Sequence, residues 1–328
     1  MKRIGLAACV TTGLLLIMMP GDALAKATPL LLSATEQEEL KVVLKYVKVV
    51  PSGVGGKPTI QVSGANLQIV NGEGKTNTTN GAGNLVIGYD QSRQQACEEV
   101  NEECIPGIPG RQTGSHNLIV GSGQSFTSYG GIVAGLVGTI TAPYASVTGG
   151  FQNEASGQHA SASGGAFNKA SGYSASVSGG TEDTASGPFS SVSGGRKSSA
   201  SASWSSISGG EGGRASGPSA WVSGGALNKA SGFSASVSGG SANTASGFFS
   251  SVSGGHENTA SENWSSISAG EDNKATAGAS SISGGYGNKA TGALAWIGGG
   301  YGNKAEGDYS SIYGGLELKA TELAQAIP

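Results

Sequence analysis

The sequence predicts an all-β fold, a parallel β-solenoid built from coils of fifteen residues and preceded by a short helix. Three observations predict it. A period of 15 residues runs without a slip through residues 131–325. In most units a Gly-Gly pair follows a short strand-like segment, with Ala269-Gly270 as a variant. Glycine supplies 58 of 328 residues and charged residues only 12%, so the order must come from the period, because large apolar side chains are few.

Two columns of the repeat form the expected interior. The second position is aliphatic in nearly every unit, and the tenth is Ala in twelve successive units, from Ala155 to Ala320. Neighbouring side chains of a strand point to opposite faces, so the serines that flank the second position are expected outside. The Gly-Gly and Ser-Gly pairs are the expected corners, where a positive φ or tight backbone packing is needed. The aliphatic residues are Val147, Val177, Val192, Ile207, Val222, Val237, Val252, Ile267, Ile282, Ile297 and Ile312.

The eighth position of the repeat is usually Asn. Stacked coils would align these residues into a ladder in which side-chain amides bond to one another. Structural turn residues that tolerate left-handed conformations are the favoured interpretation, and a ligand-binding column is the alternative. The residues are Asn153, Asn168, Asn228, Asn243, Asn258, Asn273, Asn288 and Asn303.

Aromatic residues recur at two other positions. Trp221 and Trp296 occupy the first position, and six aromatic residues share the fourteenth. An exposed aromatic ladder could bind sugar or protein, but burial at a corner or in a subunit interface is the favoured interpretation. The six are Tyr144, Phe189, Trp204, Phe249, Trp264 and Tyr309.

Residues 1–25 have the pattern of a secretory signal peptide. Basic residues at 2–3 precede a mostly apolar run at 4–19, and small residues predict cleavage after Ala25. A lipoprotein cleavage box at Cys9 is discounted, because too few residues precede it. No other segment is long and apolar enough to span a membrane. We therefore expect an exported protein, extracellular or on a bacterial cell surface, with no membrane span in the mature chain.

Residues 26–58 are predicted to form a helix and a linker. Ser33 and Glu36 have the spacing of a capping box, and apolar residues recur at helical spacing through residues 33–50. Two heptads are too few for a stable free coiled coil. The helix could pack on its own domain, for example as a cap, or serve in trimerisation. The Gly- and Pro-containing segment 51–58 is the expected linker.

Residues 59–130 are predicted to hold short strands and a projecting loop at 91–115. Cys97 and Cys104 flank an acidic stretch in that loop. In an exported protein, a disulfide between them is the leading interpretation. A metal site or reactive thiol pair is less favoured, because no His lies nearby in sequence and the spacing is not a zinc pattern. The repeats follow at 131–325, and 326–328 form a tail. The expected strands are 59–63, 66–70, 85–88 and 118–121.

Several segments resemble the head repeats of YadA-type trimeric autotransporter adhesins. They are Asn84-Leu85-Val86-Ile87-Gly88, Asn117-Leu118-Ile119-Val120-Gly121 and the Ser-Val-Ser-Gly-Gly units, and the resemblance covers roughly 84–90 and 117–320. It implies a left-handed β-roll, a homotrimer, and adhesion to host matrix, cells or surface glycans. The sequence departs from that family in its period of 15 instead of 14. It also shows no coiled-coil stalk and no anchor barrel, so the expectation is a head-only protein.

The sequence offers no candidate catalytic, cofactor or metal site. His116, His159 and His256 are far apart, and no nucleophile elbow, phosphate loop or carboxylate pair is apparent. The net charge of −3 and a pI near 5.7 make nucleic-acid binding unexpected. We therefore expect a structural or adhesive protein and no enzyme. The alternative is an ice-binding or polysaccharide-associated solenoid, because a Ser-x-Ser array runs along one face.

Overall fold

The computed structural model of the chain describes residues 14–15, 30–31, 33–98 and 110–328. It contains two compact units, 1–68 and 69–328. The fold is an all-β parallel solenoid with two short α-helices towards the N-terminus, which confirms the predicted fold class. Ala25, Cys9 and Cys104 lie outside the described residues, so the predicted cleavage site stays a prediction.

The first unit contains helix α1 (Ala34–Val43), which begins at the predicted capping box. The Ser33 hydroxyl accepts from the Glu36 amide at 3.2 Å, and the Ser33 amide donates to the Glu36 carboxylate at 2.7 Å. The bond from the Ser33 backbone amide lowers the pKa of Glu36. The helix ends at Val43, earlier than predicted, because the β-branched segment that follows favours an extended chain.

A β-hairpin follows the helix. Strand β3 (Val47–Val50) pairs antiparallel with β4 (Thr59–Val62), which confirms the strand expected at 59–63. The expected linker at 51–58 is the hairpin loop, and it holds a 3₁₀ turn, η2 (Val54–Gly56). The strand expected at 66–70 does not form, since no described segment pairs with these residues. Two-residue strands β1 (Leu14–Leu15) and β2 (Leu30–Leu31) pair antiparallel in the same unit.

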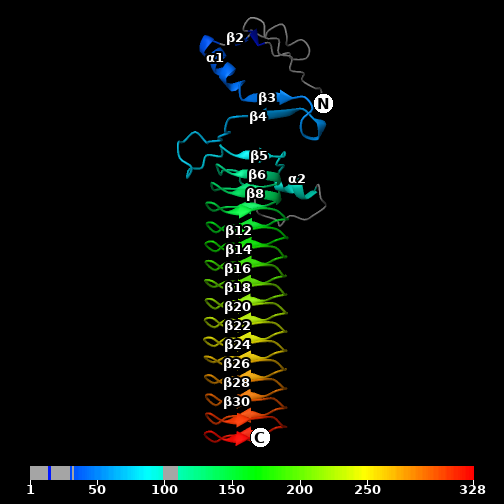
Figure 1. Cartoon of the computed structure of the whole chain (residues 1–328), viewed down its shortest axis with the longest axis vertical. Helices are drawn as coiled ribbons and strands as arrows, with labels where there is room; N and C mark the ends of the chain where they lie inside the picture. Colours follow the sequence, from blue (N-terminus) through cyan, green and yellow to red (C-terminus); the bar gives the residue numbers. More distant parts are fainter. Residues whose placement is uncertain (1–13, 16–29, 32, 99–109) are drawn as a thin grey trace. The chain divides into compact units, whose positions relative to one another are not determined.

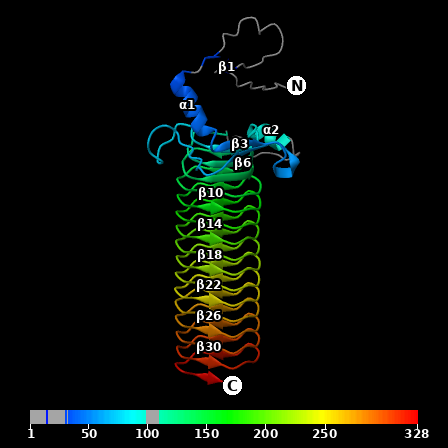
Figure 2. The same cartoon turned by 45° about the horizontal axis from the view of Figure 1, so that its top comes forward.

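The second unit is the solenoid, in which each coil gives one short strand to each of two parallel sheets (Figure 1). Successive coils pair in a constant register of 15 residues from Ser146 onward. The larger sheet has 16 strands and the smaller has 14. Figure 2 shows the coils of the second unit stacked directly on one another.

The strands of the two sheets are as follows. The larger sheet holds β5 (Leu85–Ile87), β6 (Leu118–Ser122), β8 (Ile132–Leu136), β10 (Ser146–Val147), β12 (Ser161–Ala162), β14 (Ser176–Val177), β16 (Ser191–Val192), β18 (Ser206–Ile207), β20 (Trp221–Val222), β22 (Ser236–Val237), β24 (Ser251–Val252), β26 (Ser266–Ile267), β28 (Ser281–Ile282), β30 (Trp296–Ile297), β32 (Ser311–Ile312) and β34 (Ala326–Ile327). The smaller sheet holds β7 (Ser125–Phe126), β9 (Thr139–Ile140), β11 (Glu154–Ala155), β13 (Lys169–Ala170), β15 (Thr184–Ala185), β17 (Ser199–Ala200), β19 (Arg214–Ala215), β21 (Lys229–Ala230), β23 (Thr244–Ala245), β25 (Thr259–Ala260), β27 (Lys274–Ala275), β29 (Lys289–Ala290), β31 (Lys304–Ala305) and β33 (Lys319–Ala320).

The core of the solenoid is one thin continuous column of small side chains. The aliphatic second position and the Ala at the tenth are fully buried in coil after coil, as predicted. The fifteenth position, which is Ala or Ser in most coils, is buried beside them. Because the two strands of a coil meet across Ala, their backbones approach closely, and a larger side chain there has no room.

Each coil turns at left-handed positions. The fifth position is a Gly with positive φ, as expected for a corner, and the seventh and fourteenth positions also have positive φ. The sixth position, between two left-handed residues, forms an isolated bridge with the next coil. A Cβ on the fifth-position glycine would collide with the backbone of the next coil, as at Gly240 against the carbonyl of Gly255. Glycine is therefore needed at the fifth position for two reasons: it tolerates the positive φ, and it leaves room for the backbone of the next coil.

Helix α2 (Arg93–Glu98) packs on the first coils of the solenoid, within the segment predicted as a loop at 91–115. Ala96 and Cys97 are buried against Val137. The Arg93 guanidinium donates to the Val137 carbonyl at 2.7 Å and to the Thr139 hydroxyl at 2.9 Å. No sequence pattern predicted this helix, because it is short and its first residues are polar.

Candidate functional site

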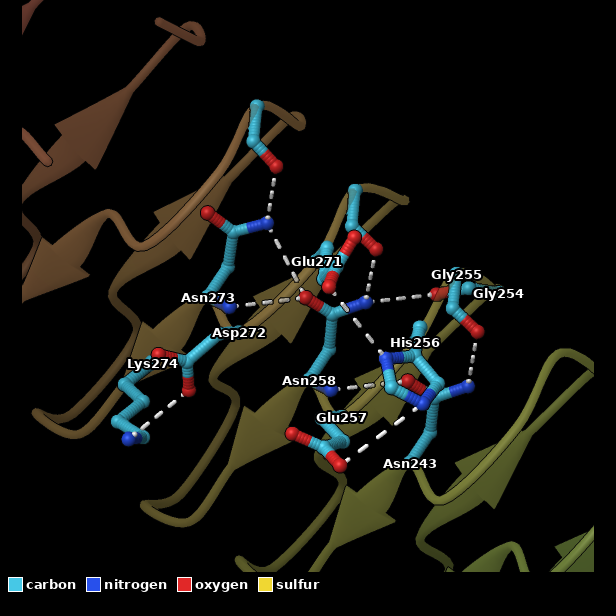
Figure 3. Close-up of polar contacts among 12 residues, drawn as sticks. Asn243, Gly254, Gly255, His256, Glu257, Asn258, Glu271, Asp272, Asn273 and Lys274 are labelled. Atoms are coloured by element: carbon cyan, nitrogen blue, oxygen red, sulfur yellow. Dashed lines mark hydrogen bonds and ion pairs between the residues drawn. The ribbon is translucent and has the colours of Figure 1, made fainter. Parts of the chain in front are cut away.

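The eighth-position asparagines form the predicted ladder, but its bonds run mainly to the backbone. Figure 3 shows three consecutive members. The Asn243 side-chain oxygen accepts from the Asn258 amide, and that of Asn258 accepts from the Asn273 amide, each at 3.0 Å. The Asn258 side-chain nitrogen donates to the carbonyls of Gly254 and Gly270 at 3.1 and 2.8 Å. Each Asn therefore ties three coils together.

Direct amide-to-amide bonding is rare in this ladder, with Asn273 to Asn258 at 3.1 Å as an example. The Asn residues do not adopt the left-handed conformation either, which belongs to the seventh position just before them. They are at most 1% exposed. A column this deeply buried cannot receive a ligand, so its role is structural.

The ladder changes chemistry at Asp183, which is fully buried in the place of an Asn. One carboxylate oxygen accepts from the Ser198 amide at 2.8 Å, and the other has no hydrogen-bond partner. Burial raises the pKa of Asp183, and the bond from the Ser198 amide only partly offsets this. The carboxyl group is thus biased towards its protonated form, in which the free oxygen can donate as the Asn amide does.

The fourteenth-position aromatic residues are exposed, so burial at a corner within the chain is wrong. Their exposed fractions run from 41% at Phe189 to 62% at Trp264. The cause is the left-handed backbone at this position, which turns the side chain outward while the fifteenth residue turns into the core. Burial in a subunit interface stays a prediction.

Six rings form a continuous stack along the solenoid, which we name the aromatic column, and all of them except the half-buried Tyr129 are exposed. Neighbouring ring centroids are 5.5, 5.3, 5.6, 5.4 and 4.2 Å apart. Stacked and edge-to-face pairs both occur within it, and such pairs contribute about 0.5–1.5 kcal/mol each beyond their buried area. Phe233, Phe248, Phe249 and Trp264 form a second stack. The column consists of Tyr129, Tyr144, His159, Tyr173, Phe189 and Trp204.

Charged side chains gather at a different corner of the coil, at the sixth to ninth positions. Between residues 131 and 261 every Lys, Arg, Asp and Glu lies at one of these four positions. The order of the coil places this charged edge between the two strands, whereas the aromatic residues occupy the return corner. Over residues 131–261 the solenoid therefore carries an uncharged aromatic edge and a charged edge on opposite sides of its core, whereas beyond them the return side also holds Glu262, Glu306, Asp308 and Glu322.

Several charges on the charged edge are paired between coils. Lys169 lies 2.9 Å from Glu154 and Lys197 3.6 Å from Glu182, whereas Lys319 lies 3.0 Å from Glu306, which is at the eleventh position. Within one coil, Lys274 lies 3.0 Å from Asp272, as Figure 3 shows. These pairs are partly exposed, so each contributes about 0–1 kcal/mol to stability.

The serine face of the larger sheet has the predicted orientation. First-position serines are half-buried and third-position serines are mostly exposed, on either side of a buried aliphatic residue. The array is not regular along the whole length, because Trp221 and Trp296 replace first-position serines. A bulky ring at these points interrupts a flat hydroxyl lattice, which weighs against an ice-matching face.

The histidines lie in three separate environments. His116 accepts from the Asn71 amide at 3.2 Å through Nε2, with Nδ1 3.1 Å from the Thr76 carbonyl. His159 is stacked within the aromatic column, and His256 lies 3.7 Å from Glu271 on the charged edge (Figure 3). Within residues 33–98 and 110–328, no cluster of His, Cys, Asp and Glu could hold a metal ion.

The structure describes only one of the two cysteines of the predicted disulfide. Cys97 is buried in helix α2 and is disulfide-bonded. Its expected partner, Cys104, lies outside the described residues, so the pairing stays a prediction. Among the helices of the described residues, none has the length and apolar character to cross a membrane.

A scan against protein-family models finds no match, and no curated protein matches the chain. The similarity to adhesin head repeats thus rests on the sequence motifs alone. The candidate site is the exposed aromatic column, because soluble proteins rarely expose a continuous row of large rings on an edge without charges.

Proposed function

We propose that this protein is an exported structural or adhesive rod that acts through contacts along its length, with no catalytic role. The observation that carries the proposal is the aromatic column on an uncharged edge. Exposed apolar patches of this kind mark interaction surfaces, and Tyr, Trp and Phe are the residues enriched at such interfaces. The charged edge on the other side would keep the rod hydrated.

The favoured arrangement is a homotrimer in which the aromatic edges contact other copies. Two features support it. The column repeats with the coil spacing, so two copies side by side could match ring to ring over a long distance. In the first unit, helix α1 has no buried residue, and Leu40, Val43 and Leu44 are 41–60% exposed. Apolar side chains on a short helix are stabilised when a partner covers them.

The assembly is tested with Phe189→Ser combined with Trp204→Ser. Serine occupies the same left-handed position at Ser219 and Ser234, so the replacement suits the backbone. By light scattering, the mature wild-type chain should have a mass near three chains, and the variant should dissociate at concentrations where the wild type does not. The matched control is Trp221→Ser, which removes a ring from the serine face and should keep the assembled mass.

A wild-type monomer at micromolar concentration would refute the assembly. Adhesion is measured on the same proteins, as retention of protein-coated beads on a layer of extracellular-matrix protein. Wild-type beads should be retained more strongly than beads that carry the Phe189→Ser, Trp204→Ser variant. Equal retention would show that the aromatic edge has no part in adhesion.

A further inference from the structure

The charged edge contains two shallow grooves, and both occur in coils that share one sequence feature. The seventh position is Gly in three coils, at Gly212, Gly287 and Gly302, and in each of them the ninth position is a cation. Because these glycines have no side chain, the surface is hollowed beside the cation. One groove, of about 440 Å³, includes Gly212, Arg214 and Lys229 in its lining. The other, of about 470 Å³, includes Gly287, Lys289, Gly302 and Lys304.

Four of the cations that line these grooves have no carboxylate partner, whereas the other two, Lys197 and Lys319, pair with Glu182 and Glu306. At two seventh positions an acid pairs with a lysine of the edge, Asp272 with Lys274 and Glu182 with Lys197. Arg214, Lys229, Lys289 and Lys304 form no ion pair within the described residues, and all are exposed. The seventh position is Gly in the coils of Arg214, Lys289 and Lys304 and Leu in that of Lys229, so none of these coils supplies a seventh-position acid.

These unpaired cations also lie beside one another in the sheet. Arg214 pairs in register with Lys229, and Lys289 with Lys304. Like charges directly opposite on neighbouring strands are destabilising, and here the spacing is only about 4.8 Å. A bound polyanion would relieve this repulsion. The two grooves are five coils apart, or about 24 Å along one straight edge, so one linear molecule can reach both.

We propose that the two glycine-floored grooves bind a linear acidic polysaccharide, with its carboxylate or sulfate groups on Arg214, Lys229, Lys289 and Lys304. The coil spacing is comparable with the length of one sugar unit. Glu211 and Glu317 also line the grooves and can accept hydrogen bonds from sugar hydroxyls. This site uses the edge opposite the aromatic column and does not depend on it.

The lining favours a polysaccharide over a nucleic acid. Single-stranded nucleic acids bind through aromatic side chains on which bases stack, and no aromatic residue lines either groove. A duplex requires an extended basic surface, whereas the chain has a net charge of −3.

The test measures binding to immobilised polygalacturonate, which carries carboxylates, and to dextran sulfate, which carries sulfates, at low ionic strength. Neutral dextran, oligo-dT and vesicles with anionic lipid complete the set. The wild-type protein should bind at least one acidic polysaccharide, more weakly as salt is raised, and should not bind neutral dextran. The two acidic probes show which anion the grooves prefer.

The variant for this test is Arg214→Thr, Lys229→Thr, Lys289→Thr, Lys304→Thr. Threonine is the natural ninth residue at Thr184, Thr244 and Thr259, so the fold should persist. Its affinity should fall about tenfold, because four exposed charge contacts are lost. The control is the double variant Lys45→Thr, Lys48→Thr, which should change affinity little. The double variant Lys289→Thr, Lys304→Thr removes the same amount of charge as this control and should weaken binding severalfold.

A second variant keeps all lysines and restores the missing acid. Gly287→Asp has open space around its new side chain, and Asp272 shows that Asp adopts this left-handed position. Gly287→Asp with Gly302→Asp should weaken polysaccharide binding as the lysine substitutions do.

The Phe189→Ser, Trp204→Ser protein should bind normally, which separates this proposal from the proposed assembly. Failure of the wild type to bind either acidic polysaccharide overturns the proposal, as does unchanged binding by the fourfold variant or equal binding to oligo-dT or vesicles.

Discussion

At the scale of single residues, the solenoid depends on a side chain that both donates and accepts in a dry interior. Asn at the eighth position meets this need, since its oxygen takes the amide of the next coil and its nitrogen supplies two carbonyls. Asp183 can accept in the same way but can donate only when it is protonated. The raised pKa of this group is the electrostatic consequence of placing a carboxyl group in an amide's position.

Asp183→Asn should stabilise the protein near neutral pH, by about 1–3 kcal/mol, because it gives the unsatisfied buried position a donor. It should also remove a pH dependence. The pKa of Asp183 is raised in the folded chain, so its contribution to stability is fully present below the ordinary pKa of about 4. That contribution is lost as pH rises through the folded-state pKa.

Urea denaturation of both proteins across this pH range measures the effect. The free energy of unfolding of the wild type should decline relative to that of Asp183→Asn as pH rises above about 4. A constant difference between the two proteins at all pH values would contradict the assignment of a buried, titrating carboxyl group.

The residue columns also show what the sequence could and could not predict. The buried aliphatic, Ala and Asn columns were predictable, because period and chemistry suffice to place them. The exposure of Phe189 and Trp204 was not, because it depends on a left-handed backbone that only Gly or Asn would have signalled in the sequence. Ser219, Ala279 and Leu294 adopt the same conformation at this position, so the coil imposes it and not the ring.

At the scale of the single coil, the two members of each Gly-Gly pair have different roles. The second has a positive φ and faces the backbone of the next coil, as Gly240 faces Gly255. The first has free space around it, and Ala replaces it naturally at Ala269. The pair is therefore one obligatory glycine and one replaceable glycine.

Gly240→Ala should destabilise the solenoid by at least about 2 kcal/mol, because a Cβ adds left-handed strain and a collision with the Gly255 carbonyl. Gly239→Ala, its neighbour and matched control, should lie within about 0.5 kcal/mol of the wild type. Chemical denaturation of the three proteins makes the comparison. Equal losses for both substitutions would show that the second glycine has no special geometry.

The elements outside the repeat were predicted less well than the coils. The capping box located the start of helix α1, because it is a local hydrogen-bond pattern. The end of the helix and the hairpin of β3 and β4 were missed, since their formation depends on pairing across a loop that no local pattern specifies. Helix α2 was missed for the same reason: burial of Ala96 and Cys97 against another segment stabilises it.

At the scale of the whole solenoid, stability is carried by contacts between adjacent coils. Every strand from β10 onward pairs only with strands one coil away, and each Asn bonds only within its own coil and to adjacent coils. A chain of this kind behaves as a sum of nearest-neighbour interactions. The sequence also repeats over 60 residues, since 168–172 recur as 228–232 and 204–208 as 264–268. That spacing equals four coils, which indicates that the length of the solenoid has changed by whole coils.

Deletion of residues 161–220, four whole coils, should therefore leave a folded and shorter rod. It joins the fifteenth position at Ala160 to the first position at Trp221, so the core columns and the ladder continue in register. Circular dichroism should show undiminished β structure per residue.

The matched control removes 161–213, a segment of similar length that joins Ala160 to the ninth position at Arg214. Its merged coil lacks the first strand and both left-handed corners that follow it, so the remaining blocks should melt at lower temperature or in two steps. Loss of the β signal in the in-register deletion would refute the modular solenoid, because only a fold with long-range contacts would fail when whole coils are removed.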